Sequence, residues 1–166
     1  MQPEHIEILE QLRAAFPAEP IQAEGAFRDG GIYPDAEPYM KQIEGKTWED
    51  LDGAYLVMRH DALSFLSTRH IVAVLPVYLR SLVEEGGWSH AAYTLLHLLT
   101  RRGPNGKPGN SRTRFAALVG VLTPAQCAVI AVILRTFATK YEGESLGLAA
   151  QTALDDHWKT YLPAGS

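Results

Sequence analysis

Residues 122–134 read LTPAQCAVIAVIL and combine the start signal of an α-helix with a run of apolar residues. Thr123, Pro124 and Gln126 stand in the order of N-cap, first and third helical residue that is typical of a helix start. Residues 127–134 are all apolar, so the helix that follows has no polar face. Such a helix has to be buried on every side. The pattern therefore predicts a buried central helix at about 124–140, with other elements around it.

The rest of the chain predicts amphipathic helices that cover this central helix. Residues 3–16 place four apolar side chains on one stripe, and Pro17 ends that helix. Residues 17–34 are rich in glycine and proline and are expected to form an irregular loop. Further helices are expected within 35–45, from Thr47, from Ser67 or Thr68, at 89–102 and from about Ser145.

The sequence contains neither an internal repeat of fixed period nor an alternating run long enough for a strand. A chain of 166 residues is long enough for one domain with a substantial core. We therefore expect an all-α fold, a compact bundle of six to eight helices around the helix at about 124–140. Residues 1–166 are expected to form a single helical domain.

Pro76 interrupts the helical pattern of residues 67–82, STRHIVAVLPVYLRSL. If Pro76 lies inside a helix, the carbonyl of Val72 loses its hydrogen-bond donor and the helix axis bends. If the chain breaks instead, Pro76 becomes the first residue of a new helix, where its missing N–H has no cost. The sequence leaves both alternatives open.

The composition is that of an ordinary globular protein, with 46% hydrophobic and 20% charged residues. The longest apolar run is far shorter than the ~20 residues that cross a bilayer, and the first residues lack the basic and apolar pattern of a signal peptide. Cys127 is the only cysteine, so no disulfide can form within the chain. We therefore expect a cytoplasmic protein without a membrane span.

The charge is unevenly distributed along the chain. Residues 1–85 carry 7 basic and 15 acidic side chains, a net charge of −8, whereas residues 86–166 carry 8 and 4, a net charge of +4. Affinity for nucleic acid depends on lysines and arginines that neutralise phosphates. The overall net charge of −4 therefore argues against a nucleic-acid partner.

Four short motifs follow one another in an order that resembles a family of small bacterial proteins classified as a domain of unknown function. They are GKTWEDL at 45–51, DALSFLS at 61–67, LPVYL at 75–79 and LTPAQ at 122–126. The resemblance covers roughly residues 5–140 and implies a short, single-domain, helical protein. It implies no activity, cofactor or catalytic residue. The glycine-rich segment 103–111 departs from the compact form of that family as an insertion.

Several histidines lie near each other or near acids in the sequence. On a helix, His90, Tyr93 and His97 share the side opposite the leucine stripe. The two imidazoles are then about 10 Å apart along the axis, too far to share one metal ion easily. We therefore expect this side to face solvent or a partner.

An acid beside an imidazole is the pairing that general base catalysis needs. His60 precedes Asp61, and His157 follows Asp155 and Asp156. Adjacent residues do not face each other on a helix, however. His157 also shares a face with apolar residues, so we expect it to be a hydrogen-bonded core histidine. His5 and His70 carry no motif.

Known catalytic and ligand-binding signatures are missing from the sequence: it has no H-E-x-x-H, paired C-x-x-C, G-x-S-x-G, P-loop or G-x-G-x-x-G motif. Cys127 lies among alanines and valines and is expected to be an inert core thiol. We therefore assign no catalytic, cofactor-binding or metal-binding residue from the sequence, and no cofactor.

Residues 101–114, RRGPNGKPGNSRTR, form a basic segment without an acid. Its cationic side chains are Arg101, Arg102, Lys107, Arg112 and Arg114. The segment is interpreted as a solvated loop, with binding of an acidic protein surface or of another anion as alternatives. Because it contains no aromatic residue that could stack on bases, nucleic acid is the weaker of these alternatives.

The sequence favours a small non-catalytic interaction protein, of the immunity or adaptor type, over an enzyme. In this hypothesis the chain docks a protein partner through its acidic N-terminal half. Two alternatives depend on side chains that the fold would have to bring together: a metal-dependent hydrolase that uses histidines, and a protein that binds a small apolar ligand in a closed pocket lined by tryptophan. The histidines are His60, His70, His90 and His97, and the tryptophans are Trp48, Trp88 and Trp158.

Overall fold

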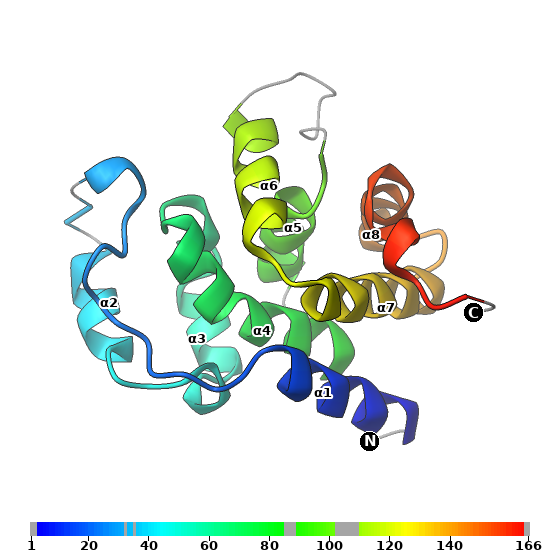
Figure 1. The fold of residues 1–166 in the computed structure, drawn as a ribbon, viewed down its shortest axis with the longest axis horizontal. Helices are drawn as coiled ribbons and strands as arrows, with labels where there is room; N and C mark the ends of the chain where they lie inside the picture. The colour runs from blue at the N-terminus through cyan, green and yellow to red at the C-terminus, as the bar shows by residue number, and fades with distance from the viewer. Residues whose placement is uncertain (1–2, 32, 35, 85–88, 102–109, 165–166) are drawn as a thin grey trace.

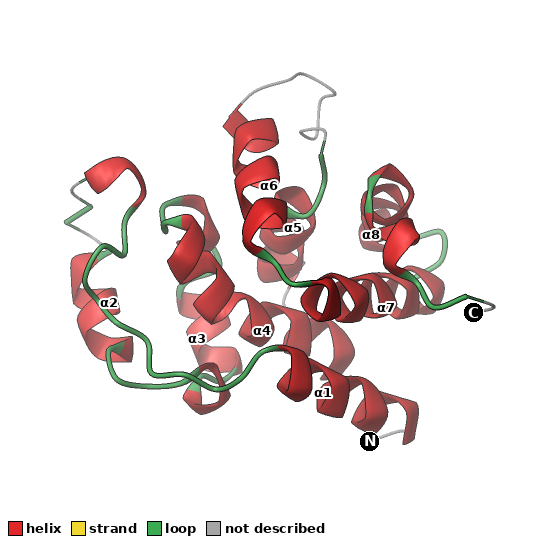
Figure 2. Cartoon of the chain, in the orientation of Figure 1, coloured by secondary structure: helices red, strands yellow, loops and turns green. Residues whose placement is uncertain are grey.

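The computed structural model describes residues 3–31, 33–34, 36–84, 89–101 and 110–164 (Figure 1). The described residues form eight α-helices and no strand (Figure 2), which confirms the predicted all-α fold. The α-helices are α1 (Pro3–Ala15), α2 (Glu37–Ile43), α3 (Gly53–Met58), α4 (Thr68–Glu84), α5 (Ser89–Leu98), α6 (Asn110–Val121), α7 (Pro124–Lys140) and α8 (Ser145–Asp156). Four short 3₁₀ helices are η1 (Arg28–Gly30), η2 (Trp48–Asp50), η3 (Ala62–Ser64) and η4 (Trp158–Tyr161).

The helix α7 begins at the predicted cap. The Thr123 hydroxyl accepts a hydrogen bond from the Gln126 backbone N–H at 3.2 Å, and the Gln126 side-chain oxygen accepts one from the Thr123 N–H at 2.9 Å. No residue from Cys127 to Ala138 is exposed, because α1, α4, α8 and η4 pack around the helix. The prediction of a buried helix at 124–140 is therefore confirmed.

A second helix, α4, shares the centre of the bundle with α7. It runs through the middle of the molecule (Figure 1) and packs against α1, α3, α5, α6, α7 and η2. The helix continues through Pro76, so the first of the two alternatives for this residue is correct. The apolar residues expected to pack here, Ile71, Val74, Val77, Leu79 and Leu82, are all buried.

The chain between α1 and η2 contains the irregular loop predicted from its glycines and prolines. Ile21 exchanges two backbone hydrogen bonds, both 2.8 Å long, with Gly45 and Lys46 just after α2. Gly45 has a φ of 77°, a left-handed conformation that favours glycine and ends α2 as predicted. These bonds fix the segment of the loop that leads away from α1.

The helix expected from Thr47 is only one turn long. The predicted cap is present, since the Asp50 carboxylate accepts hydrogen bonds from the Thr47 N–H and hydroxyl, both at 2.8 Å. Asp52 then accepts a hydrogen bond from the Tyr55 N–H at 3.2 Å and starts α3 as a new helix. The predicted start at Thr47 is therefore confirmed, and the helix ends after one turn because a second cap follows within five residues.

Within the described residues, every helix is too short or too polar to cross a lipid bilayer.

Candidate functional site

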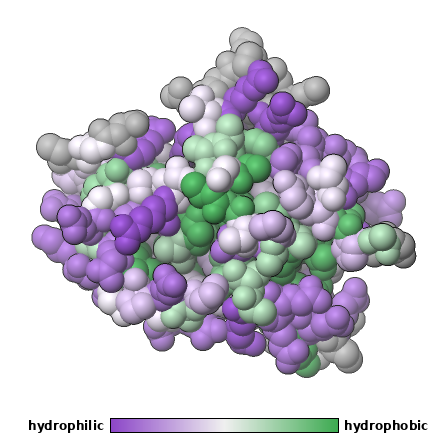
Figure 3. Space-filling view, viewed as in Figure 1, coloured by the Kyte–Doolittle hydropathy of each residue, from purple (hydrophilic) through white to green (hydrophobic). Residues whose placement is uncertain are grey.

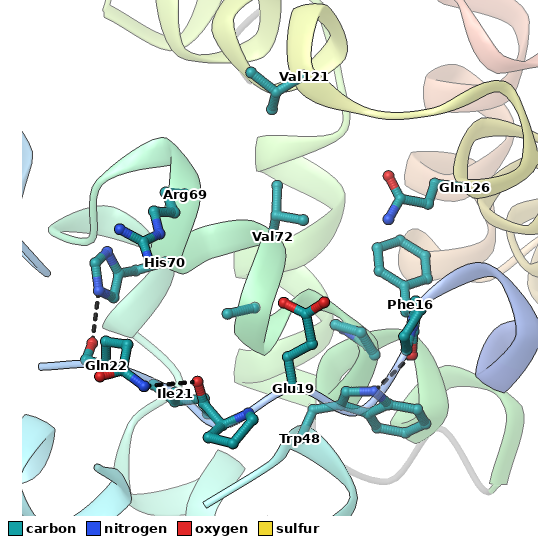
Figure 4. A pocket seen from close by; sticks show the side chains of 14 residues that line it. Phe16, Glu19, Ile21, Gln22, Trp48, Arg69, His70, Val72, Val121 and Gln126 are labelled. Carbon is teal, nitrogen blue, oxygen red and sulfur yellow. Dashed lines mark hydrogen bonds between the residues drawn. The ribbon is translucent and has the colours of Figure 1, made fainter. Parts of the chain in front are cut away.

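Apolar surface gathers in the middle of one face of the molecule, over the end of α6 (Figure 3). At this place a cleft of about 440 Å³ lies between the loop that follows α1 and the helix α4. Its walls come from residues 16–22, Trp48, the face of α4 from Arg69 to Pro76, Val121 of α6 and Gln126 of α7 (Figure 4). We call this cleft the α4 groove.

The floor of the α4 groove is apolar. Val72, Ala73 and Pro76 lie on one face of α4, because residues three and four apart in a helix are neighbours. Phe16 and Trp48 form the adjoining wall. Trp48 is only 3% exposed, and its indole N–H donates to the Phe16 carbonyl at 2.9 Å. The tryptophan is therefore a fixed wall of the groove.

His70 fixes the loop against α4 at one end of the groove (Figure 4). Its Nε2 lies 2.7 Å from the Gln22 carbonyl oxygen, and its Nδ1 lies 2.8 Å from the Ser67 hydroxyl. Because a carbonyl only accepts hydrogen bonds, Nε2 carries the proton and Nδ1 accepts from the hydroxyl. Burial lowers the pKa of His70, and the nearby Arg69 lowers it further, while the bond to Gln22 opposes this change. Both ring nitrogens are thus used inside the protein, which leaves neither for a metal ion or a substrate proton.

Three polar side chains surround the apolar floor. The Glu19 carboxylate points from the loop toward α4, whereas Arg69 and Gln126 lie at the rim (Figure 4). In the described part of the chain, no hydrogen bond or ion pair engages Glu19 or Arg69 through its charged group. The oxygen of the Gln126 amide is used by the α7 cap, so its NH₂ group remains as a donor. The groove therefore offers one anionic acceptor, one cationic donor and one neutral donor.

The structure brings together two of the four histidines of the metal-dependent alternative. The ring centroids of His60 and His90 are 5.3 Å apart. Within the described residues, however, no group of three or more histidine, cysteine or acidic side chains is arranged to hold a metal ion. The predicted exposure of His90, Tyr93 and His97 is confirmed.

His157 is packed differently from the prediction. Its ring makes edge contacts with Phe115 and Trp158, each with 5.1 Å between centroids, but its buried Nε2 has no hydrogen-bond partner among the described residues. The expected hydrogen bond is therefore wrong, because aromatic rings rather than polar groups surround the imidazole. Burial lowers the pKa of His157, and the charge of Arg101 lowers it further, against the opposing effect of Asp156.

Asp155 and Asp61, two of the acids near histidines in the sequence, lie at the surface. Asp155 forms an exposed ion pair with Lys159 at 3.6 Å, and Asp61 is exposed. Cys127 is 2% exposed, and burial raises the pKa of its thiol, as expected for an inert core cysteine.

Only part of the basic segment 101–114 belongs to the described residues. Arg102 and Lys107 lie outside them, as does Trp88. Arg112 and Arg114 belong to α6, so the predicted loop does not extend to residue 114. The Arg114 guanidinium donates a hydrogen bond to the Leu63 carbonyl. Trp158 is fully buried and donates to the Leu99 carbonyl at 2.7 Å.

The α4 groove is the site that sequence reasoning missed. Of the two tryptophans named for a ligand pocket that the structure describes, Trp48 lines the groove and Trp158 does not, and the groove is open rather than closed. Pro76 is a sequence signal that could have drawn attention to this place, because a proline inside an apolar helix is unusual, but on the sequence alone it was interpreted as a bend in the fold.

Comparison of the chain with protein-family models, with curated proteins and with solved structures gave no match. The resemblance carried by the four motifs therefore stays a prediction. In the structure, the motifs form η2, the turn with η3, the middle of α4 and the start of α7.

Proposed function

We propose that this chain is a small, non-catalytic interaction protein that binds a segment of a protein partner in the α4 groove. The observation that carries this proposal is an apolar floor bordered by Glu19 and Arg69, whose charged groups have no hydrogen-bond or ion-pair partner among the described residues. The cleft volume of about 440 Å³ falls in the range of ligand-binding sites. Interfaces commonly combine such an apolar centre with a polar rim.

A protein segment fits the groove better than an isolated small molecule. Small-molecule sites bury most of the surface of their ligand, whereas this groove is open and ends at Val121, which is 56% exposed. An exposed aliphatic side chain at the edge of an apolar cleft extends the contact surface beyond the cleft itself. A chain that lies across the groove can cover Val121 as well as the floor.

Charge indicates which partner is complementary. Most of the groove wall comes from residues 16–76, which lie within the N-terminal half with its net charge of −8. Glu19 also points into the groove. Complementary charge accelerates association and suppresses wrong partners. The partner segment is therefore apolar and carries a cationic group that faces Glu19, and the binding weakens as salt is added.

The chemistry of the histidines and the cysteine supports binding over catalysis. Both nitrogens of His70 are occupied, and burial lowers the pKa of His157 and raises the pKa of the Cys127 thiol. We also propose a cytoplasmic location, with which a single buried thiol is compatible.

Selection from a display library of random peptides tests the proposal, with two lysine substitutions as probe and control. Val121→Lys puts a positive charge at the edge of the groove, whereas Leu148→Lys makes the same change at a residue of α8 that is 59% exposed and does not line the groove. Selected peptides should be apolar and basic. They should bind the wild type and Leu148→Lys equally, and Val121→Lys about tenfold more weakly.

Two results would contradict the proposal. In the first, the selection yields no peptide, while the apolar dye anilinonaphthalene sulfonate binds the wild type and does not bind Val121→Lys. This result would make the groove a small-ligand site. The other is a set of peptides that bind Val121→Lys as tightly as the wild type, which would place the interface elsewhere.

A further inference from the structure

Pro76 lies inside α4 and contributes to the floor of the groove. Proline has no backbone N–H, so the carbonyl of Val72 loses the donor that would close its helical hydrogen bond. In an α-helix this carbonyl points toward residue 76, on the face between the side chains of Val72, Ala73 and Pro76. All three residues line the groove. Helix geometry therefore predicts that the freed carbonyl lies on the groove face of α4, beside the ring of Pro76.

A backbone carbonyl without a donor is a strong hydrogen-bonding group that needs a partner. A second acceptor, the Glu19 carboxylate, points toward the same part of α4 from the loop (Figure 4). Two acceptors beside an apolar floor are complementary to a group that carries several N–H donors on an apolar stem.

Among side chains, arginine fits this description best. Its guanidinium has five N–H donors in a rigid fork, so it can serve a carbonyl and a carboxylate together. Its methylene stem can pack on the apolar floor at Val72 and Ala73, which are partly exposed. Arg69 lies at the other side of the rim (Figure 4), and its like charge keeps the incoming cation toward Glu19.

We propose that the α4 groove binds an arginine side chain of the partner, with the Val72 carbonyl that Pro76 leaves open and the Glu19 carboxylate as its two acceptors. This inference rests on the proposed function, because it requires that a protein segment enter the groove. It makes Pro76 a positioning residue: the ring acts by withholding an N–H from Val72.

The test measures the affinity of the peptides selected above for three protein variants. Pro76→Ala supplies the missing N–H to the Val72 carbonyl, and Glu19→Gln removes the charge while it keeps the shape. Each change should raise the Kd about tenfold, the loss of one hydrogen bond to a charged group. Glu10→Gln changes net charge equally at an exposed position of α1 outside the groove, and it should leave the Kd unchanged.

Changes in the peptide give a second measurement, and its first part uses only the wild-type protein. In the wild type, replacement of the peptide arginine by norleucine, which keeps an apolar stem, should weaken binding by more than about tenfold. In Pro76→Ala and Glu19→Gln, the same replacement in the peptide should raise the Kd by a smaller factor, because one of the two acceptors is already lost in the protein variant. This coupling is what a double-mutant cycle detects.

The outcomes separate this inference from the proposed function. Peptides that are insensitive to Val121→Lys, or no peptides at all, overturn both. Peptides that depend on Val121 but lack arginine, or whose affinity is the same for the wild type and Pro76→Ala, overturn the arginine site and leave the interaction groove intact.

Discussion

Replacement of Pro76 by alanine should make the protein more stable while it weakens binding in the groove. A proline inside a helix loses one hydrogen bond, and its ring collides with the carbonyl four residues earlier. Alanine at position 76 restores the N–H to the Val72 carbonyl and has the highest helix propensity. If Pro76 served only the packing of α4, its loss would instead lower stability.

The magnitude follows from two opposing effects. Relative to alanine, proline in a helix interior is unfavourable by about 3 kcal/mol. Pro76 is buried, so the substitution also removes two methylene groups from the core, which costs about 1.6 kcal/mol at about 0.8 kcal/mol for each. The difference is a gain of roughly 1 kcal/mol in the free energy of unfolding. For a domain of this length, 1 kcal/mol raises the melting temperature by about 2–4 °C.

Urea unfolding followed by circular dichroism and by tryptophan fluorescence measures this difference, with the slope of the transition as a check that both proteins unfold alike. A loss of more than about 1 kcal/mol in Pro76→Ala would refute the reasoning. It would mean that the ring and the bend stabilise the bundle more than the helical hydrogen bond does, and Pro76 would then be structural.

Three further predictions concern the core and its caps. Thr123→Ala removes the side-chain acceptor of the α7 cap and should lower the free energy of unfolding, measured in urea, by about 1 kcal/mol. Thr139→Ala, at an exposed position late in the same helix, is the control and should change the free energy of unfolding by less than about 0.5 kcal/mol. Trp158→Phe leaves a cavity and an unpaired Leu99 carbonyl, so it should cost about 2–4 kcal/mol, and thermal unfolding close to that of the wild type would contradict the packing described here. Folding lowers the pKa values of His70 and His157 below 6.5. As the pH drops below about 6.5, the unfolded chain therefore binds more protons than the folded protein, and the free energy of unfolding falls. His157→Phe should reduce the loss of stability between about pH 7.5 and about pH 5.5, and an unchanged pH profile would contradict burial of a neutral His157.

The features that were predictable from the sequence depend on neighbouring residues. The α7 cap was predictable because Thr123 and Gln126 are three residues apart, and the burial of α7 followed from its all-apolar run. The cap formed by Thr47 and Asp50 was also present, yet the helix it started was one turn long. Its length depended on Asp52, whose own capping bond to Tyr55 competes for the next turn. Local signals thus gave the start of each element more reliably than its end.

The features that the sequence did not reveal depend on residues far apart in the chain. His60 and His90 lie in contact across a turn and a helix, and no periodicity relates them. The groove combines the loop after α1, one face of α4 and the junction of α6 with α7. The fate of Pro76 also required the fold, because burial of α4 against six other elements stabilises a helix that the proline alone would interrupt.

The wall of the groove opposite α4 is held by bonds from several directions, which favours a binding site over a packing defect. Pro17 ends α1 and turns the chain into the loop, where Phe16 accepts from Trp48, Ile21 pairs with the chain after α2, and Gln22 accepts from His70. A loop fixed at three points loses little conformational freedom when a partner binds, so more of the contact energy appears as affinity. A gap left by imperfect packing would not require a fixed wall, because an unrestrained loop could move onto the apolar face of α4 and bury it. The bonds oppose this closure, and they keep Val72 and Ala73, which are partly exposed, accessible to a partner.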